Sequence, residues 1–287
     1  MYEKELDTAI ELARRAARLI LDYRRRGINA ESKVGSDNFM EPVTEADRAA
    51  SELIISGLQM NFPDDAILSE EAADPGPARL ANKRVWIIDP IDGTAGFIRN
   101  ESDFAVQIGL AVKGRPKAGV VLLPAWGKVY CASAGRGSWV IEPSGEKKRL
   151  FVSEKSEFSQ INLAVSRNHR SPGMSTIIER LGFGREIRRG SVGLKIGLIA
   201  ERESDLYIHL SPRTKTWDTC APEIILTEAG GRLTDLWGNE YRYDLDDVRN
   251  HGGVIASNGV IHGRVVSLLS PLLEEFGRTP IQKVTSG

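Results

Sequence analysis

The amino-acid sequence predicts an α+β protein in which helices and β-sheets pack in layers. Apolar residues near the N-terminus recur every three or four positions, short apolar runs separated by turn residues fill the middle, and strand-like and helix-like segments alternate afterwards. Each segment has an apolar face that must be buried against another layer. With 287 residues, 41% of them hydrophobic, the chain is long enough for one large domain or two modest ones.

The N-terminal segment predicts two amphipathic helices. The first carries its apolar residues at helical spacing and ends near Gly27. The second begins near Thr44, has Asp47 in its first turn and stops at Phe62 and Pro63. The apolar positions of the first helix are Leu6, Ile10, Ala13, Ala17 and Ile20.

Short apolar runs predict β-strands in the middle of the chain. Residues 66–69 and 85–88 form two neighbouring strands. From Phe104 to Ile141, apolar runs are punctuated by K-G-R-P, A-W-G and A-G-R-G, which predicts an antiparallel meander. The polar stretch from Glu142 to Lys148 predicts a surface turn.

A domain boundary is expected near residue 150, which separates residues 1–150 from residues 151–287. The second part alternates strands with helices. Its predicted strands are 161–166, 206–210 and 254–257, and its predicted helices are 174–181, 194–200 and 221–229.

Composition and charge narrow the possible functions. A formal net charge of −1 gives no general attraction to nucleic acid or to an anionic membrane, so any phosphate recognition must be local. The N-terminus is charged, and no apolar run approaches the roughly 20 residues that span a bilayer. We expect a soluble cytoplasmic protein without stable membrane insertion, in which Cys131 and Cys220 are buried reduced thiols.

One segment places two carboxylates where a metal site needs them. The run W-I-I-D-P-I-D-G-T-A-G-F (86 to 97) delivers Asp89 and Asp92 on a tight turn after an apolar strand. Hard oxygen ligands of this kind suit Mg²⁺, which waters and substrate phosphate complete. For an isolated D-x-x-D-G, ordinary turn chemistry is an equally good explanation.

Further carboxylates follow in the chain, and each also has a purely structural explanation. Glu70 and Glu71 come after the apolar run 66–69, but paired glutamates are often only solvated. Asp47 fits a capping box with Thr44. Asp218 fits a helix N-cap, with a proline in the first turn. These structural explanations do not account for the joint occurrence of all these carboxylates with D-P-I-D-G-T.

Four ordered motifs resemble the Mg²⁺-dependent, lithium-sensitive phosphatases of the inositol monophosphatase superfamily. They are V-T-E-A-D (43 to 47), S-E-E (69 to 71), the 86-to-97 segment and W-D-T-C-A-P-E-I-I-L-T-E-A-G-G (217 to 231). The resemblance implies the layered α-β-α-β-α sandwich of the inositol monophosphatase and fructose-1,6-bisphosphatase type. It also implies a metal-binding N-terminal subdomain, with the C-terminal one contributing Asp218 and substrate contacts.

The resemblance implies two or three Mg²⁺ ions and a role for each matched residue. Glu70, Asp89 and the carbonyl of Ile91 would hold one ion, while Asp89, Asp92 and Asp218 would hold another. Asp47 and Thr94 would orient the attacking water, and the amides of Gly93, Thr94 and Ala95 would face the phosphate. Thr94 alternatively reads as a helix N-cap. Glu70, Asp92 and Asp218 would also contact substrate.

Other segments resemble one branch of that superfamily, the 3'(2'),5'-bisphosphate nucleotidases, which act in sulfur assimilation. These segments are V-S-R-N-H (165 to 169), G-S-V-G-L-K-I-G-L-I-A-E (190 to 201) and G-F-I-R-N-E-S-D-F-A-V-Q-I-G-L (96 to 110). Cleavage of the 3'-phosphate of adenosine 3',5'-bisphosphate is the implied reaction. The candidate substrate residues in these and neighbouring segments are Arg167, His169, Ser191, Lys195 and Arg213.

Two departures weaken the branch assignment and leave the metal motifs intact. Position 95 is Ala where the family more often has Lys or Thr, and S-V-G-L-K replaces the branch's S-S-x-K. An inositol monophosphatase or a broad sugar-phosphate phosphatase is therefore an alternative. A catalytically silent regulatory or RNA-binding protein on the same scaffold is a second one. We expect a small phosphate ester as the partner, no nucleic-acid polymer, and a monomer or homodimer.

Overall fold

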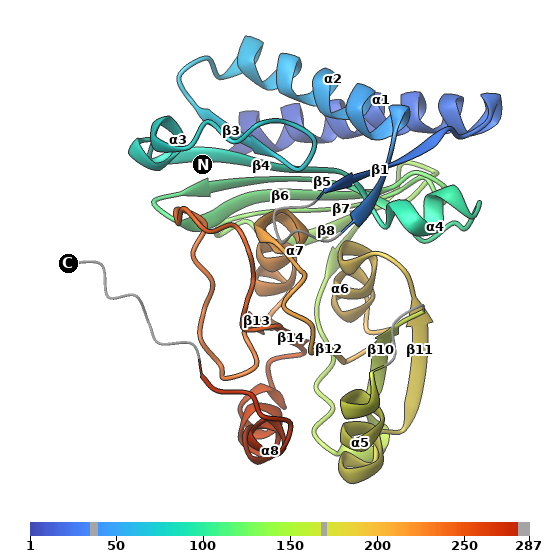
Figure 1. Ribbon diagram of the computed structural model, residues 1–287, viewed down its shortest axis with the longest axis vertical. Helices are drawn as coiled ribbons and strands as arrows, with labels where there is room; N and C mark the ends of the chain where they lie inside the picture. Colours follow the sequence, from blue (N-terminus) through green and yellow to red (C-terminus); the bar gives the residue numbers. More distant parts are fainter. Residues whose placement is uncertain (35–39, 168–170, 281–287) are drawn as a thin grey trace.

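The computed structural model describes residues 1–34, 40–167 and 171–280, and it has five layers (Figure 1). Two long helices cover a seven-stranded sheet, and two further helices separate that sheet from a five-stranded sheet. Two more helices cover the opposite face of the five-stranded sheet. This confirms the predicted α-β-α-β-α sandwich. No helix in the described part of the chain is long and apolar enough to cross a bilayer.

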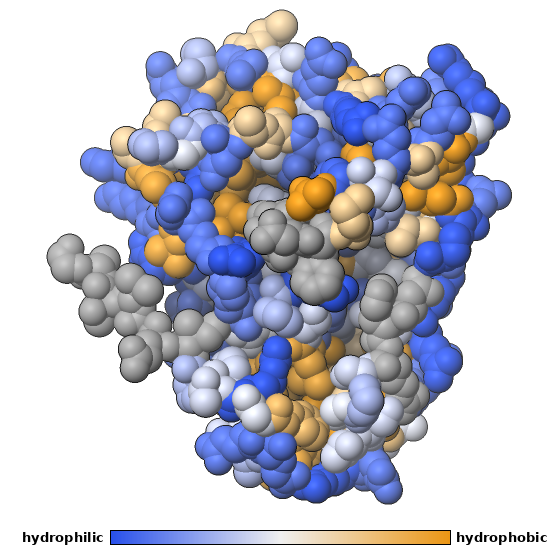
Figure 2. Space-filling view, viewed as in Figure 1, coloured by the Kyte–Doolittle hydropathy of each residue, from blue (hydrophilic) through white to orange (hydrophobic). Residues whose placement is uncertain are grey.

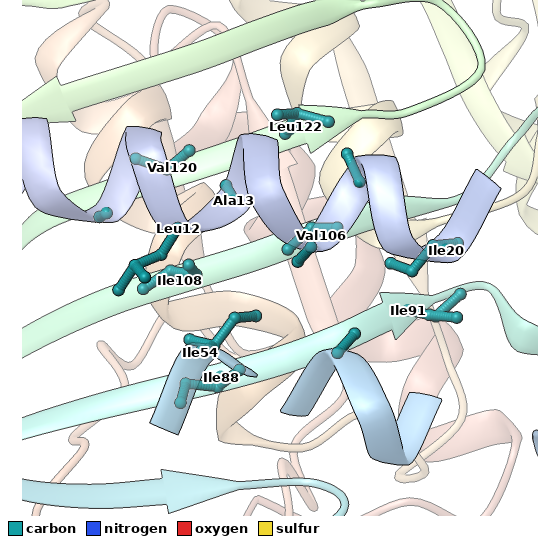
Figure 3. Close-up of a cluster of buried hydrophobic side chains, with 14 of the residues drawn as sticks. Leu12, Ala13, Ile20, Ile54, Ile88, Ile91, Val106, Ile108, Val120 and Leu122 are labelled. Carbon is teal, nitrogen blue, oxygen red and sulfur yellow. The ribbon is translucent and has the colours of Figure 1, made fainter. Parts of the chain in front are cut away.

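The outer helices α1 (Glu3–Arg26) and α2 (Glu45–Asn61) confirm the two predicted amphipathic helices. Gly27 ends the first, and a Thr44–Asp47 capping box opens the second. Figure 3 shows their apolar faces meeting the sheet. The buried residues labelled there are Leu12, Ala13 and Ile20 from α1, Ile54 from α2, and Ile88, Ile91, Val106, Ile108, Val120 and Leu122 from the sheet.

The seven-stranded sheet has the order β3-β4-β5-β6-β7-β8-β9. Its first pair is parallel, as expected for two neighbouring strands, and the remaining pairs form the predicted antiparallel meander. The strands are β3 (Ala66–Ser69), β4 (Arg84–Asp92), β5 (Ala105–Val112), β6 (Arg115–Leu123), β7 (Lys128–Ser133), β8 (Ser138–Ile141) and β9 (Lys147–Leu150).

The predicted surface turn from Glu142 to Lys148 is too long, because β9 already begins at Lys147. Lys147 and Arg149 lie over the ring of Trp139, at 4.9 and 5.8 Å from its centroid. These cation–π contacts help to explain how so basic a segment forms an edge strand.

Three short elements near the metal motifs complete this half. The hairpin β1 (Ala30–Val34) and β2 (Met40–Thr44) is a separate two-stranded sheet, and α3 (Pro77–Ala81) and α4 (Thr94–Ile98) flank β4 in sequence.

The five-stranded sheet has the order β11-β10-β12-β14-β13 and is covered by α5 (Pro172–Leu181) and α8 (His262–Glu275). The three predicted strands of this half are confirmed. The short, highly charged β11 and the three-residue β13 carry no apolar run that would predict them. The strands are β10 (Asn162–Ser166), β11 (Arg185–Arg189), β12 (Leu206–His209), β13 (Arg232–Thr234) and β14 (Val254–Ser257), and a 3₁₀ turn, η1 (Phe158–Gln160), precedes them.

The two large sheets lie on either side of residue 150 in sequence. That each half is a subdomain stays a prediction. Cys131 and Cys220 are buried and unpaired, as predicted.

The central helices α6 (Val192–Ala200) and α7 (Thr216–Glu228) join the sheets. Helix α7 approaches β5 and β6 at two glycines. A Cβ on Gly109 would lie 2.8 Å from Cys220 Sγ, and one on Gly119 would lie 2.5 Å from Ile224 Cγ2 and 2.7 Å from the Ala221 carbonyl oxygen. Glycine therefore sets how closely α7, and the motif it carries, lies against the sheet.

Gly119→Ala should lower the free energy of unfolding by about 1–3 kcal/mol, because the added methyl overpacks the α7 backbone. Urea unfolding followed by circular dichroism measures the change. The matched control is Gly263→Ala in α8, where nothing lies within 4 Å of the new methyl and alanine favours the helix. Equal stabilities for the two variants would contradict the close α7–sheet contact.

Candidate active site

Three carboxylates from two elements converge between the sheets. Asp89 and Asp92 come from the end of β4 and Asp218 from the first turn of α7, and one oxygen of each lies within 4.8 Å of the others. The sequence correctly predicted that this strand delivers two carboxylates, but the predicted backbone conformation between them was wrong. The strand does not end in a tight turn after Asp89; it continues to Asp92 through an irregularity that keeps Ile91 buried in the core.

Asp89 has the environment of a metal ligand. Its side chain is buried, with 1% of the residue exposed, and its Oδ1 has no hydrogen-bond partner among the described residues. A buried carboxylate oxygen without a donor is costly unless a cation satisfies it. The donor set is all oxygen, which fits a hard divalent ion such as Mg²⁺.

Helix α6 holds Asp92 in place. Asp92 Oδ2 accepts hydrogen bonds from Ser191 Oγ at 2.5 Å and from the Gly193 amide at 2.8 Å. Ser191 is also the N-cap of α6, which settles its position beside the cluster. Lys195, one turn later, is only 3% exposed and donates to the Gly190 carbonyl at 3.0 Å. Burial raises the pKa of Asp92, and the positive charge of Lys195 opposes that rise.

Asp218 is fixed by the start of α7. The sequence suggested an N-cap followed by Pro222 in the first turn, but Lys215 is the N-cap residue and Pro222 lies inside the helix. The physical reason is that Asp218 Oδ2 accepts a hydrogen bond from the Lys215 amide at 2.6 Å, which makes it the third helical residue. Lys215 is itself buried and pairs with Glu41 of β2 at 2.5 Å.

Glu70, a predicted metal ligand, lies at the border of the cluster. Its Oε1 accepts a hydrogen bond from Lys33 Nζ at 3.0 Å, and the same ammonium contacts Glu71. Both strands of the β1–β2 hairpin therefore contact the site, β1 through Lys33 and β2 through the ion pair of Glu41 with Lys215. Neither residue was found from the sequence, because a single lysine carries no signal until folding brings it to a carboxylate far along the chain.

The predicted contact between Asp47 and Thr94 is present. Thr94 Oγ1 lies 3.2 Å from Asp47 Oδ1 and 3.0 Å from the carbonyl oxygen of Ile91. Asp47 Oδ2 accepts from the Thr44 amide at 2.9 Å, so the capping box and the site share one carboxylate. The N-cap of α4 is Gly93, not Thr94, which is the first helical residue.

Gly93 needs to be glycine. Its φ is +99°, and a Cβ would lie 2.9 Å from the Asp103 carbonyl oxygen. Ala95 is half-buried in the first turn of α4 beside it. The Gly93–Ala95 backbone follows Asp92 directly and opens α4, and that its amides face the phosphate stays a prediction.

Burial and mutual repulsion raise the pKa values of these carboxyls. Burial is the largest cause for every one of them, and it raises the pKa of Asp47 to about 6 and of Glu70 to about 7. The pKa values of Asp89 and Asp218 are raised well above their usual range by burial and by the neighbouring carboxylates. So many buried acids are stable together only with added positive charge or protons.

The predicted substrate residues are not all gathered in one place. Arg167 contacts Asp103 and lines a cavity of about 690 Å³ between α5 and α8, seen as an apolar hollow in Figure 2. Arg213 is exposed in the loop that precedes α7. His169 lies outside the described residues.

Comparison with known proteins decides the family. A model of the inositol monophosphatase family matches residues 1–274. The chain belongs to the inositol monophosphatase family. It is therefore a metal-dependent phosphomonoesterase, and the Asp89, Asp92 and Asp218 cluster is the group of described residues suited to a metal. The expectation of a phosphate-ester substrate is supported by the same membership.

Relatives named for different substrates are about equally similar. The fructose-1,6-bisphosphatase/inositol-1-monophosphatase of Thermotoga maritima is 33% identical, covering 95% of this chain and 98% of that one. The 3'(2'),5'-bisphosphate nucleotidase CysQ of Escherichia coli K12 is also 33% identical, covering 83% and 93%. The histidinol-phosphatase of Mycobacterium tuberculosis is 32% identical, covering 94% and 99%.

A solved structure shares the whole fold. The Thermotoga maritima inositol monophosphatase superposes with a TM-score of 0.80 at 31% identity, covering 96% of this chain and 100% of the other. The comparisons thus establish fold and reaction class and leave the substrate branch open.

In the presence of a chelator, the free energy of unfolding should fall by about 5 kcal/mol as the pH rises from 4.5 to 8. The folded-state pKa values of Asp47 and Glu70, about 6 and 7, lie above their unfolded values, so the folded state binds more protons in this window. Raising the pH removes those protons and destabilises the fold. Saturating Mg²⁺ should remove most of the decline, as urea unfolding at each pH would measure.

Asp89→Asn removes one buried charge, so this variant should be more stable than the parent in chelator at pH 8 and should respond less to Mg²⁺. Asp64→Asn, which changes an exposed carboxylate, is the control and should behave as the parent does. A stability that is independent of both pH and Mg²⁺ would contradict the metal-site assignment.

Proposed function

We propose that the protein hydrolyses the 3'-phosphate of adenosine 3',5'-bisphosphate to give AMP and phosphate. The observation that carries this proposal is a cavity of about 690 Å³ that is lined by Arg167, a residue connected to the carboxylate cluster through Asp103 and the start of α6. A small monophosphate needs little beyond the cluster itself, whereas a bisphosphorylated nucleoside needs room for a base and a cationic site for a second phosphate. Pockets of this volume are of the size that takes such ligands.

The walls of the cavity combine apolar and cationic side chains. Met174, Ile208 and Phe276 offer apolar surface to a base, while Arg188 and Arg278 contribute positive charge. Nη1 of Arg278 is buried and has no partner among the described residues. An arginine with an unused donor in a cavity favours an oxyanion such as phosphate.

Arg167 connects this cavity to the cluster. Its guanidinium contacts Asp103, and Asp103 Oδ2 also accepts a hydrogen bond from the Gly190 amide at 3.0 Å. The next residue, Ser191, bonds to Asp92. A ligand that reaches from the cavity past Arg167 therefore arrives at the carboxylates, which supports one substrate occupying both regions.

The chain's own groups divide the work of hydrolysis. Divalent ions, when bound, neutralise the phosphate charge and favour attack by water. Asp89, Asp92 and Asp218 would hold those ions, with Glu70 and the Ile91 carbonyl as further ligands. Thr94 donates its hydroxyl hydrogen bond to Asp47, which leaves the hydroxyl oxygen to accept a hydrogen bond from the attacking water and orient it. Gly93 and Ala95 amides would face the phosphate.

Similarity to CysQ and the V-S-R-N-H segment support the nucleotidase branch. The alternatives are an inositol monophosphatase or sugar-phosphate phosphatase, favoured by the Thermotoga relative, and a histidinol-phosphatase, favoured by the mycobacterial one. A substrate comparison separates them, because only the bisphosphonucleotide uses the cavity as well as the cluster.

Thr94→Val should lower kcat by about two orders of magnitude or more, because the hydroxyl that orients water is lost while the metal ligands stay. The concentration of Mg²⁺ that gives half-maximal activity should change by less than about threefold, since ligand charge is unchanged. Thr94→Ser keeps the hydroxyl and is the matched control, expected to retain most activity. A large shift in the Mg²⁺ requirement with unchanged kcat would show that Thr94 supports the metal site instead.

The unmodified protein should hydrolyse adenosine 3',5'-bisphosphate with a higher kcat/KM than inositol 1-phosphate, fructose 1,6-bisphosphate or histidinol phosphate. Arg278→Met should lower kcat/KM for the bisphosphonucleotide about tenfold or more and leave inositol 1-phosphate unaffected. Phosphate release measures both.

Arg26→Met, at the exposed end of α1, is the control for these assays and should leave every substrate unaffected. A preference of the unmodified protein for inositol 1-phosphate would overturn the proposal. Equal losses on both substrates in Arg278→Met would instead show that this arginine supports the fold.

A further inference from the structure

Another cavity, of about 580 Å³, lies along the C-terminal part of α6. Its floor is apolar and consists of Val140, Leu150 and Leu198, all buried. It shares no lining residue with the cavity beside α5 and α8, nor with the carboxylate cluster. Any ligand bound there is therefore separate from the substrate, and the inference is independent of which phosphate ester the enzyme cleaves.

The charged groups of the wall leave a net positive edge. Lys128 is neutralised by Glu201 at 2.8 Å and lies 3.9 Å from Glu142, so these three side chains sum to one negative charge. The remaining wall holds one acid, Glu203, against four cations, one of which, Lys148, also pairs with Glu146 at 3.0 Å. The four cations are Lys148, Arg149, Arg189 and Arg202.

Arg189 has an unused hydrogen-bond donor in this wall. Its Nη1 donates to the Arg188 carbonyl at 3.1 Å, but its Nε is buried and has no partner among the described residues. Leaving a charged donor buried and unpaired costs about 1–3 kcal/mol or more, so an acceptor is missing. Guanidinium groups bind phosphate oxygens in two-point fashion, which makes a phosphate group the fitting acceptor.

Aromatic side chains border the same cavity. Trp126 is half-buried, and Phe151 is 49% exposed with the Arg149 guanidinium 5.2 Å from its ring centroid. Two aromatic side chains at the border of a cavity with an apolar floor are suited to a planar ring. One phosphate-sized cationic edge and one ring-sized apolar area describe a nucleoside monophosphate.

We propose that this cavity binds a nucleoside monophosphate at a site distinct from the active site. Arg189 contacts its phosphate, and Trp126 and Phe151 border its base. The site lies against the helix whose first turn holds Asp92 through Ser191 and Gly193, so its ligand contacts an element that shapes the catalytic cluster.

The test is titration of 5'-AMP into the full chain in the presence of EDTA, followed by calorimetry and by tryptophan fluorescence. Without metal, the carboxylate cluster repels the phosphate and disfavours binding in the active site. One site is expected, with adenosine alone and inorganic phosphate alone each binding about tenfold more weakly or worse. Arg189→Met should raise the Kd about tenfold or more, and Phe151→Ala, an exposed position, at least about threefold.

Two matched arginine variants locate the ligand. Arg26→Met should leave the Kd unchanged, as should Arg167→Met, which alters the other cavity. No binding up to about 10 mM 5'-AMP, equal affinity for inorganic phosphate, or a Kd that responds to Arg167→Met in place of Arg189→Met would overturn the proposal. Because Phe151 is 49% exposed and belongs to none of the buried apolar clusters of the described residues, Phe151→Ala tests the site even where Arg189→Met unfolds.

Discussion

The close burial of several carboxylates is the constraint on which the rest of the structure depends. Asp89, Asp92 and Asp218 lie within 4.8 Å of one another at their nearest oxygens, and Coulomb repulsion alone would separate them. They stay together because each is fixed by a different element. Sheet pairing holds the end of β4, the first turn of α6 holds Asp92, and the Lys215 amide holds Asp218. The fold therefore supplies the geometry and leaves the missing positive charge to a bound cation.

The position of Asp218 in the cluster depends on how the central helix α7 packs against the seven-stranded sheet. Helix α7 can bring Asp218 to β4 only because glycines at 109 and 119 let its backbone lie close to β5 and β6. Glu223, one turn further along, anchors the same helix, since its carboxylate is buried and accepts a hydrogen bond from Tyr243 at 2.6 Å. A polar residue buried that deeply fixes the rotation of α7, and with it the direction in which Asp218 points.

Local patterns in the sequence were sufficient to predict layers of helices and sheets and the strand that delivers Asp89, because each depends on periodicity. The five-layer sandwich and the pairing of Asp47 with Thr94 were predicted only from the family resemblance. The local patterns failed where long-range contacts decide. Lys33 reaches Glu70 across 37 residues, and β11 forms from a charged segment that pairs with a strand already in place. The start of α7 was predicted too late in the chain, because a proline such as Pro222 is typical of a first helical turn. The helix begins earlier, since the side chain of Asp218 accepts a hydrogen bond from the Lys215 amide from within the first turn.

The carboxylate cluster and the cavity proposed to bind the substrate are formed by different parts of this chain. The carboxylates depend on the seven-stranded sheet and the central helices, whereas the cavity that Arg167 lines is formed by the strand ends of the five-stranded sheet, by α5 and by residues that follow α8. Residues of that second region can change without moving the cluster, because the ends of strands and helices tolerate substitution better than a packed core. This separation explains how relatives named for inositol phosphates, bisphosphonucleotides and histidinol phosphate are about equally similar to one chain. Overall identity follows the shared reaction, and under the proposed function substrate choice depends on the few side chains that surround the cavity.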